Sequence, residues 1–217
     1  FRSVNIFALF SPEHGINGVE DHDNIADATD SASGIRIFSL YGKTRRPTPE
    51  MLQNLDALVF DIQDVGARFY TYETTMAYAI EAAAKAKIPF YVPDRPDPIT
   101  GLHVEGLMLD RADISFVGSW PLPLRHGMTA GELAQLFNAK FLKKKCDLTV
   151  VPMENWTRDE WFDQTSLPWV LPSPNLPTLD SATVYPGQVI LEGTDLSEGR
   201  GTTKPFEMFG APWIDGF

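Results

Sequence analysis

The residues of this chain best suited to chemistry are carboxylates that directly follow short apolar segments. Glu13, Asp61 and Asp94 each follow such a segment, and Gly or Pro lies close by in each case. Short apolar segments that end in this way are typical of buried strands. Loops at the carboxyl ends of parallel strands meet at one edge of a sheet, where ligands bind. The sequence therefore predicts one cleft lined by several carboxylates, as in a hydrolytic site.

Glu13 and Glu105 are the two candidates for catalytic carboxyl groups. Glu13 precedes His14 and a glycine, and Glu105 follows His103 by two residues and also precedes a glycine. A carboxyl group beside an imidazole can serve as a general acid or base. The alternatives are a glutamate that caps a loop at Glu13 and a plain surface loop at Glu105. We expect both glutamates to converge with the strand-end aspartates on one cleft.

Three further side chains are candidates for substrate binding. Arg68 and Tyr70 lie between a predicted strand and a predicted helix, where the arginine could bind a substrate carboxylate through two hydrogen bonds or pair with a protein carboxylate. His126 precedes another predicted helix, whose first amides could bind an anion or could simply be capped. At Arg68, and at the helix start after His126, ligand binding and a purely structural role both stay open.

Residues 192–203 form a polar segment rich in glycine and hydroxyl groups, and they include Glu198 and Arg200. The segment lacks the Gly-Lys-Ser/Thr ending of a Walker loop, and no strand leads into a dinucleotide fingerprint. We interpret it as a loop that hydrogen-bonds a glycan or a peptide, and we expect no cofactor.

A metal-dependent site is the main alternative to a hydrolytic site made of carboxyl groups, because the chain has four histidines and many acids. The histidines show neither the His-Glu-x-x-His motif nor paired spacing, so we expect no metal ligands among them. The histidines are His14, His22, His103 and His126.

Composition excludes several classes of function. The net charge of −11 argues against nucleic acid as a partner, since phosphate binding needs basic surfaces. The single cysteine, Cys146, excludes an internal disulfide and a cysteine metal cage. No stretch approaches the roughly 20 apolar residues of a membrane span.

Predicted strands and helices alternate along the chain. This alternation favours a mainly parallel, layered α/β sheet. A short helix is expected to begin at Thr48, with Pro49 at its first helical position. The strands are expected at residues 5–10, 35–40, 57–60, 88–92 and 148–151. The longer helices are expected at residues 70–87 and 129–144.

Residues 153–186 are rich in tryptophan and proline and are expected to be mostly irregular. Trp156, Trp161 and Trp169 could stack on sugar rings or could fill the core.

Four motifs resemble a known bacterial family. Residues 11–15, 39–44, 60–72 and 198–207 look like the DUF1343 family of NamZ-like exo-β-N-acetylmuramidases, and the resemblance spans nearly the whole chain. Glu13 matches the glutamate of the family's Pro-Glu-His-Gly motif, which is a catalytic candidate, whereas Glu105 is assigned by position.

The resemblance implies both a fold and an activity. We expect a Rossmann-like catalytic domain with helices on both faces over residues 1–182, its N-terminal part missing, and a truncated C-terminal domain that begins within residues 183–217. The implied activity is release of N-acetylmuramic acid from the non-reducing ends of peptidoglycan fragments. The implied partners are therefore muramyl glycans, and the implied location is outside the cytoplasm.

Three functions remain in competition. A glycosidase needs two carboxylates beside a sugar, and a cation such as Arg68, Arg125 or Arg200 for the lactyl carboxylate of muramic acid. The alternatives are a metal-dependent amidase or esterase that acts on cell-wall material, and a non-catalytic glycan-binding module.

Overall fold

Two small sheets form the framework of the computed structural model, which describes residues 4–215. In the first sheet, β1 (Ala8–Ser11) pairs in parallel with β3 (Arg36–Ser39). The other edge of β3 pairs antiparallel with the short strand β2 (Ala28–Thr29). The loop that follows β1 begins at Pro12, so this sheet places Glu13 just beyond the carboxyl end of a strand.

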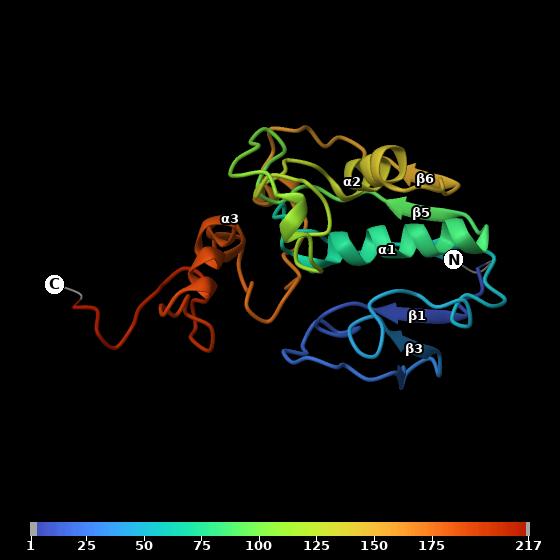
Figure 1. Ribbon diagram of the computed structural model, residues 1–217, viewed down its shortest axis with the longest axis horizontal. Coiled ribbons are helices and arrows are strands. Elements are labelled where there is room, and N and C mark those ends of the chain that lie inside the picture. Colours follow the sequence, from blue (N-terminus) through green and yellow to red (C-terminus); the bar gives the residue numbers. More distant parts are fainter. Residues whose placement is uncertain (1–3, 216–217) are drawn as a thin grey trace.

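The second sheet is entirely parallel, with β5 (Phe90–Pro93) between β4 (Leu58–Val59) and β6 (Leu148–Val151). Phe90 and Val92 point to the same side of β5 and are both buried. The predicted α/β class with a mainly parallel sheet is therefore confirmed. The structure adds that the strands divide into two sheets and that β2 runs antiparallel (Figure 1).

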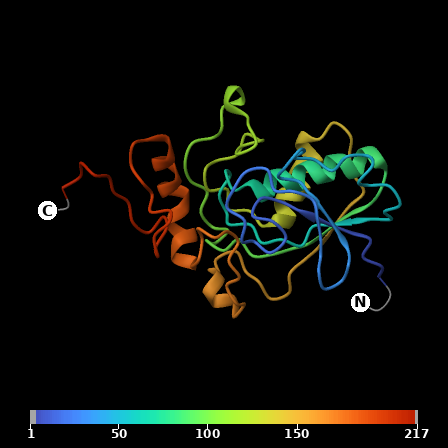
Figure 2. The same ribbon diagram turned by 90° about the horizontal axis from the view of Figure 1, so that it is seen from below.

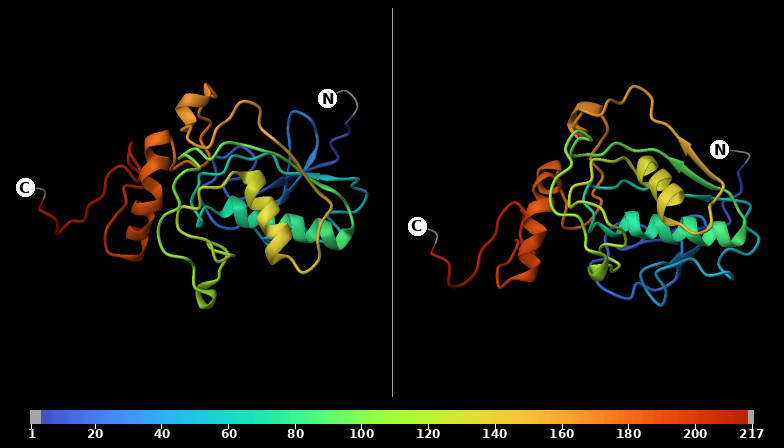
Figure 3. Two further views of the ribbon diagram at one scale, coloured as in Figure 1. Left: turned by 90° about the horizontal axis from the view of Figure 1, so that it is seen from above. Right: turned by 45° about the horizontal axis from the view of Figure 1, so that its top comes forward.

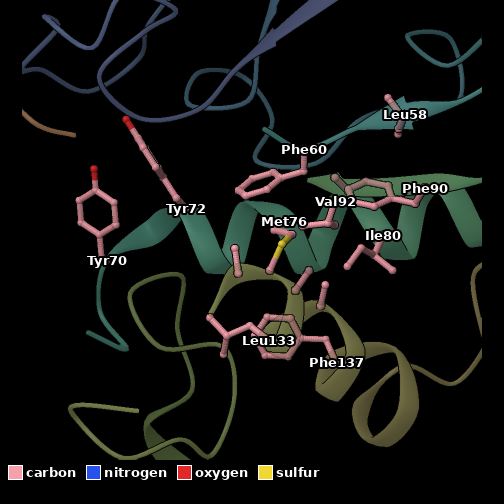
Figure 4. Packing of buried hydrophobic residues seen from close by; sticks show 14 of the residues in the cluster. Leu58, Phe60, Tyr70, Tyr72, Met76, Ile80, Phe90, Val92, Leu133 and Phe137 are labelled. Carbon is pink, nitrogen blue, oxygen red and sulfur yellow. The ribbon is translucent and has the colours of Figure 1, made fainter. Parts of the chain in front are cut away.

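Helix α1 (Thr71–Ala86) forms the centre of the hydrophobic core. Nearly all of its first ten residues are buried, and Met76 and Ile80 pack among side chains from the strands and from the next helix (Figure 4). Its small alanines allow this close packing on several sides. The helix ends at Lys87, whose left-handed backbone has a φ of 63° and whose N–H bonds to Ala83.

Helix α2 (Ala130–Leu136) packs against α1 and the second sheet (Figure 3). The hydroxyl of Thr129 and the carboxylate of Glu132 form a reciprocal capping box at its start, as the sequence predicts. The helix then widens into a π-helical segment, η2 (Phe137–Phe141), and ends there, three residues before the predicted end.

Helix α3 (Leu179–Gln188) begins at a capping box formed by Thr178 and Ser181 and continues into a 3₁₀ segment, η4 (Val189–Gly193). In each view α3 lies toward the C-terminal end of the molecule, away from the N-terminus (Figures 1 and 2). The predicted domain boundary at residue 182 falls inside α3, and the division into two domains stays a prediction.

Two short 3₁₀ segments complete the described elements, η1 (Arg111–Asp113) and η3 (Phe162–Thr165). Residues 153–186 were expected to be mostly irregular. Residues 153–178 are irregular apart from η3, whereas residues 179–186 belong to helix α3, which was not predicted. The prediction of a short helix at Thr48 was wrong. The Thr48 carbonyl accepts the N–H of Leu52, but the following residues form only turns. Within residues 4–215, no helix has the length and apolar character needed to cross a bilayer.

Candidate functional site

A cavity of about 430 Å³ lies where the sheet-bearing part of the chain meets α3 and the residues after it. This volume falls within the range of small-ligand sites, about 300–1,000 Å³. Polar lining residues come from both parts of the chain, namely Glu13, His14, Asp21, Tyr70, Thr71 and Ser173 from the first and Tyr185, Glu192 and Arg200 from the second. The cavity therefore exists only because distant segments of the chain meet.

Glu13 is a half-buried carboxyl group held at the start of α1. The Thr71 hydroxyl donates to Glu13 Oε2 over 2.5 Å, and the Tyr72 hydroxyl donates to the backbone carbonyl of Glu13 over 3.0 Å. One contact orients the carboxyl and the other fixes the backbone that carries it. This arrangement gives the cavity one carboxyl group in a defined position.

His14 follows Glu13 in a left-handed backbone conformation, with a φ of 70°. Such a conformation is uncommon for a residue other than glycine and occurs often at functional sites. The Nδ1 of His14 lies 2.7 Å from the carbonyl of Glu20, so this nitrogen carries a proton and donates it. In the neutral ring Nε2 is then an acceptor, available to a hydroxyl group in the cavity.

Tyr70 and Tyr72 lie at the start of α1, at one end of the buried hydrophobic cluster (Figure 4). Both hydroxyls contact the carbonyl of Pro172, which ties the irregular segment 153–178 to α1. Burial raises the pKa of Tyr72 to about 12 and that of Tyr70 well above its usual value. Both phenols therefore stay neutral and act as hydrogen-bonding groups, and Tyr70 lines the cavity.

Arg200 is the single Arg or Lys among the described residues that line the cavity. Its guanidinium lies 2.6 Å from Glu192 and 2.8 Å from Glu198, and it covers the ring of Phe206 at 5.0 Å. These carboxylates raise the pKa of Arg200 against the opposing effect of burial. The polar segment predicted to bind a ligand thus contributes a fixed cation.

Glu105 does not line the cavity that contains Glu13, so the expected pairing of these two carboxylates was wrong. It is exposed and forms a 2.7 Å ion pair with Arg125 at a neighbouring cavity of about 580 Å³. The two cavities share only Leu124 and Ile190 among the described residues. Reciprocal backbone hydrogen bonds also join Glu105 to Arg125, so backbone and side chain both hold Glu105 beside that arginine.

The strand-end aspartates do not converge on the cavity either. Asp61 is exposed and pairs with Arg95, with a shortest contact of 2.7 Å. Asp94 accepts hydrogen bonds from the Thr129 hydroxyl and the Gly131 amide, and so caps α2. Asp61 thus forms an ion pair and Asp94 caps a helix, so both carboxylates have structural contacts at the end of the second sheet.

Two further candidates lie outside the cavity. Arg68 is buried and donates to the carbonyls of Leu107 and Leu122, and so anchors the backbone at these two residues. His103 is exposed and lines neither of the two cavities. Of the predicted site residues, the structure brings together Glu13, His14, Tyr70 and Arg200, with Glu198 attached through Arg200.

His126 lies in a buried polar cluster with Asp64 and Glu73. Its Nε2 is 3.4 Å from a carboxylate oxygen of each acid, and none of the three side chains is more than 7% exposed. Burial raises the pKa of Glu73 well above its usual range, Asp64 adds to this rise, and Arg68 opposes it. Burial also raises the pKa of nearby Asp97 to about 7.

The same three side chains have the donor types and proximity of a metal site, since their ligand atoms lie within 4.8 Å of one another. The backbone N–H of Met128, however, donates to His126 Nδ1 over 3.1 Å. In the neutral ring the proton must then reside on Nε2, the nitrogen that faces the two acids. A nitrogen that carries a proton does not bind a metal ion, so this tautomer does not suit a metal ligand. At 3.4 Å, however, His126 Nε2 and both Glu73 carboxylate oxygens have no hydrogen-bond partner among the described residues.

Sequence reasoning missed several cavity residues. Asp21 and Glu192 are carboxylates of the cavity wall, and Thr71 and Tyr185 supply hydroxyl groups. Asp21 lies in a segment with several aspartates, residues 17–34, but nothing in this local pattern singles it out. Tyr185 lies in a segment expected to be irregular, and no local pattern marks it as part of a site.

The chain matches two family models. One is described as exo-beta-N-acetylmuramidase NamZ, N-terminal, and covers residues 1–180. The other is described as exo-beta-N-acetylmuramidase NamZ, C-terminal, and covers residues 183–217. The chain is also 57% identical, over 212 residues, to the peptidoglycan beta-N-acetylmuramidase NamZ of Bacillus subtilis strain 168. That match covers 97% of this chain and 51% of the relative.

Two crystal structures of DUF1343 family proteins from Bacteroides fragilis NCTC 9343 are similar in fold. One has a TM-score of 0.91 at 46% identity and covers 98% of this chain and 54% of its own chain. The other has a TM-score of 0.87 at 40% identity and covers 100% of this chain and 57% of its own. The chain thus spans about half the length of each of these relatives.

Proposed function

This chain belongs to the NamZ family of exo-β-N-acetylmuramidases, and from that premise we propose that the protein hydrolyses peptidoglycan fragments. The proposed reaction releases N-acetylmuramic acid from the non-reducing end of the glycan. The observation that carries the assignment to this site is the position of Glu13, the carboxyl of the family motif. It lies in a cavity of suitable size, with its orientation fixed by Thr71.

Hydrolysis of a glycosidic bond requires a group that donates a proton to the leaving oxygen. We assign this role to Glu13, because a carboxyl group supplies the proton and the contact with Thr71 holds it in place. A neutral His14 offers Nε2 as an acceptor for a sugar hydroxyl beside it. Donation by a positioned acid contributes about 10²–10⁴-fold to the rate.

The reaction also needs a second carboxylate, and Asp21 and Glu192 are the two others that line the cavity. Glu192 is held by Arg200 at 2.6 Å, which balances its charge. Asp21 accepts a 3.1 Å hydrogen bond from the side-chain amide of Asn175, which orients it without neutralising it. We therefore assign the second role to Asp21 in place of Glu105.

Muramic acid differs from glucosamine by a lactyl group that carries a carboxylate. Arg200 supplies the positive charge that such a group needs within the cavity. The other candidate cations lie outside this cavity: Arg68 is bound to backbone carbonyls, and Arg125 lines the neighbouring cavity. Arg200 is therefore the residue that we assign to recognition of the lactyl carboxylate.

The rival functions receive less support from the structure. The buried cluster around His126 is not exposed to a substrate, so it does not favour a metal-dependent amidase or esterase. Trp156, Trp161 and Trp169 line neither of the two cavities, so they do not form a glycan-binding wall there.

The test uses the full-length protein and a pair of chromogenic substrates, a β-N-acetylmuramide and the matching β-N-acetylglucosaminide. We expect release of the chromophore from the muramide only, and we expect the rate to survive exhaustive chelation. Equal turnover of the two substrates would contradict recognition of the lactyl group. Loss of activity on chelation, with recovery on addition of zinc, would favour the metal-dependent alternative.

A further inference from the structure

The side chain that contacts the Glu13 carboxyl comes from the first residue of α1. Thr71 Oγ1 lies 2.5 Å from Glu13 Oε2, although the two residues are 58 positions apart in sequence. Thr71 is buried, and it also lines the cavity. The contact therefore joins the loop after β1 directly to the central helix of the core.

The hydroxyl of Thr71 is not required to cap the helix. The N-cap of α1 is Tyr70, and its side chain forms no capping hydrogen bond, so Thr71 is the first helical residue. Capping hydrogen bonds are made by the side chain of the N-cap residue, so the hydroxyl of Thr71, one position further on, does not serve as the cap. The direction of this hydroxyl toward Glu13 therefore calls for another explanation.

Other contacts restrain the same glutamate from different sides. The Tyr72 hydroxyl donates to the Glu13 carbonyl over 3.0 Å. Tyr41, which follows β3, interacts through its hydroxyl with the side chains of Glu13 and Arg45, and its pKa is raised to about 12, mainly by burial. The ring of Tyr41 is in turn stacked under the Arg45 guanidinium at 3.8 Å. Glu13 is thus restrained by α1 on one side and by Tyr41, which follows β3, on another.

We infer that Thr71 is a positioning residue for Glu13, which it holds in the orientation needed for proton donation. This inference rests on the role proposed above for Glu13. Thr71 acts through the glutamate and needs no contact with the substrate. A reacting group displaced by about 1 Å can cost a factor of about 10² in rate, so the loss of this single contact has a measurable effect.

The experiment compares Thr71→Val with Thr71→Ser in the full-length enzyme, with the chromogenic muramide as substrate. Valine preserves the shape of threonine and removes the hydroxyl, whereas serine retains it. For Thr71→Val we expect kcat to fall about 10–100-fold with KM within about twofold of the wild-type value. For Thr71→Ser we expect kcat within about threefold of wild type, because the donor to Glu13 is restored.

The matched control is Thr75→Val, one turn further along α1. Thr75 is also buried, and its hydroxyl has no hydrogen-bond partner among the described residues. This variant removes a hydroxyl from the same helix without touching Glu13, so we expect unchanged kcat. A loss in Thr75→Val as large as that in Thr71→Val would show that the effect is one of helix packing and would overturn the inference.

A double-mutant cycle separates this inference from the proposed role of Glu13. In a Glu13→Gln background, Thr71→Val should cause no further loss, because the group on which Thr71 acts is already inactive. If Glu13→Gln is inactive and Thr71→Val has normal kcat, the positioning role is wrong and the role of Glu13 stands. If Glu13→Gln retains normal kcat, the role of Glu13 fails, and the inference that rests on it fails too.

Discussion

Among the Arg and Lys side chains, only one described residue brings positive charge to the cavity wall. Glu13, Asp21 and Glu192 contribute carboxyl groups to the wall, whereas Arg200 is the single Arg or Lys among its described residues. Arg200 is held by Glu192 and Glu198, so its position is fixed before a substrate arrives. A cation fixed in this way can distinguish an acidic sugar from a neutral one.

Replacement of Arg200 by glutamine should therefore weaken binding of the muramide more than it slows its conversion. A hydrogen bond to a charged group contributes about 1.5–3 kcal/mol, which corresponds to about a 10–100-fold increase in KM. Steady-state kinetics with the chromogenic muramide test this expectation. A fall in kcat at unchanged KM would instead indicate that Arg200 acts in the chemical step.

Asp97 provides a prediction about stability and pH. Burial raises its folded-state pKa from 3.8 to about 7, with Asp64 adding to the rise and His126 and Arg125 opposing it. Between these values the folded protein holds a proton that the unfolded chain has lost. The stability from this proton is complete below about pH 4 and is lost as the pH rises toward 7.

Asp97→Asn removes this dependence while it preserves the oxygen that accepts the Ile99 N–H. Relative to wild type, the variant should gain about 2–3 kcal/mol of unfolding free energy between pH 5 and pH 8. Urea denaturation at both pH values measures the gain, with Asp56→Asn at an exposed position as the control. A difference between Asp97→Asn and wild type that does not vary with pH would show that Asp97 is not protonated in the folded protein.

Among the secondary-structure elements, close packing of α2 on the second sheet limits substitution. Gly131 lies in the first turn of α2, where an added Cβ would meet Val150 Cγ1 at 2.5 Å and Asp94 Cγ at 2.8 Å. Gly187 lies in α3 and has no atom within 4 Å of the corresponding position. The two glycines therefore test packing and helix propensity separately.

Gly131→Ala should destabilise the protein by about 1–2 kcal/mol. Overpacking costs about 1–3 kcal/mol, whereas the higher helix propensity of alanine over glycine stabilises by about 1 kcal/mol at most. Gly187→Ala should be neutral or stabilising by up to about 1 kcal/mol. Midpoints of urea unfolding for both variants measure the two effects. Equal midpoints would mean that the second sheet yields to the added methyl group.

The sequence was sufficient to predict most strands and helices, because buried strands and amphipathic helices leave local patterns. It was not sufficient at residues 48–51, where a good N-cap and a proline are followed by too few helical contacts. The short span of β4 and the π-helical end of α2 also depend on tertiary packing. Local signals thus predict the type of element better than its extent.

The site was only partly predictable for the same reason. Glu13 and His14 were identified because they follow a strand within a distinctive motif. Glu105 was expected beside Glu13 because the two have similar local settings, whereas its position in the neighbouring cavity and its ion pair with Arg125 arise from the folded loops. Asp21 and Tyr185 became visible as cavity residues only when distant segments were brought together.

At the scale of the whole molecule, the cavity belongs to neither part of the chain alone. Residues matched by the N-terminal family model supply Glu13 and Asp21, and residues matched by the C-terminal model supply Tyr185 and Arg200. We propose that this shared cavity, and not the neighbouring one at Glu105, is where the substrate is hydrolysed.

The most direct test compares Glu13→Gln with Glu105→Gln in the full-length enzyme, with release of N-acetylmuramic acid from peptidoglycan fragments as the readout. Both substitutions replace an acid by its neutral isostere, so each serves as the control for the other. We predict that Glu13→Gln lowers kcat by about 10²–10⁴-fold, since an amide cannot donate the proton, whereas Glu105→Gln stays within a fewfold of wild type. Near-normal release by Glu13→Gln, or an equal loss in Glu105→Gln, would contradict the account.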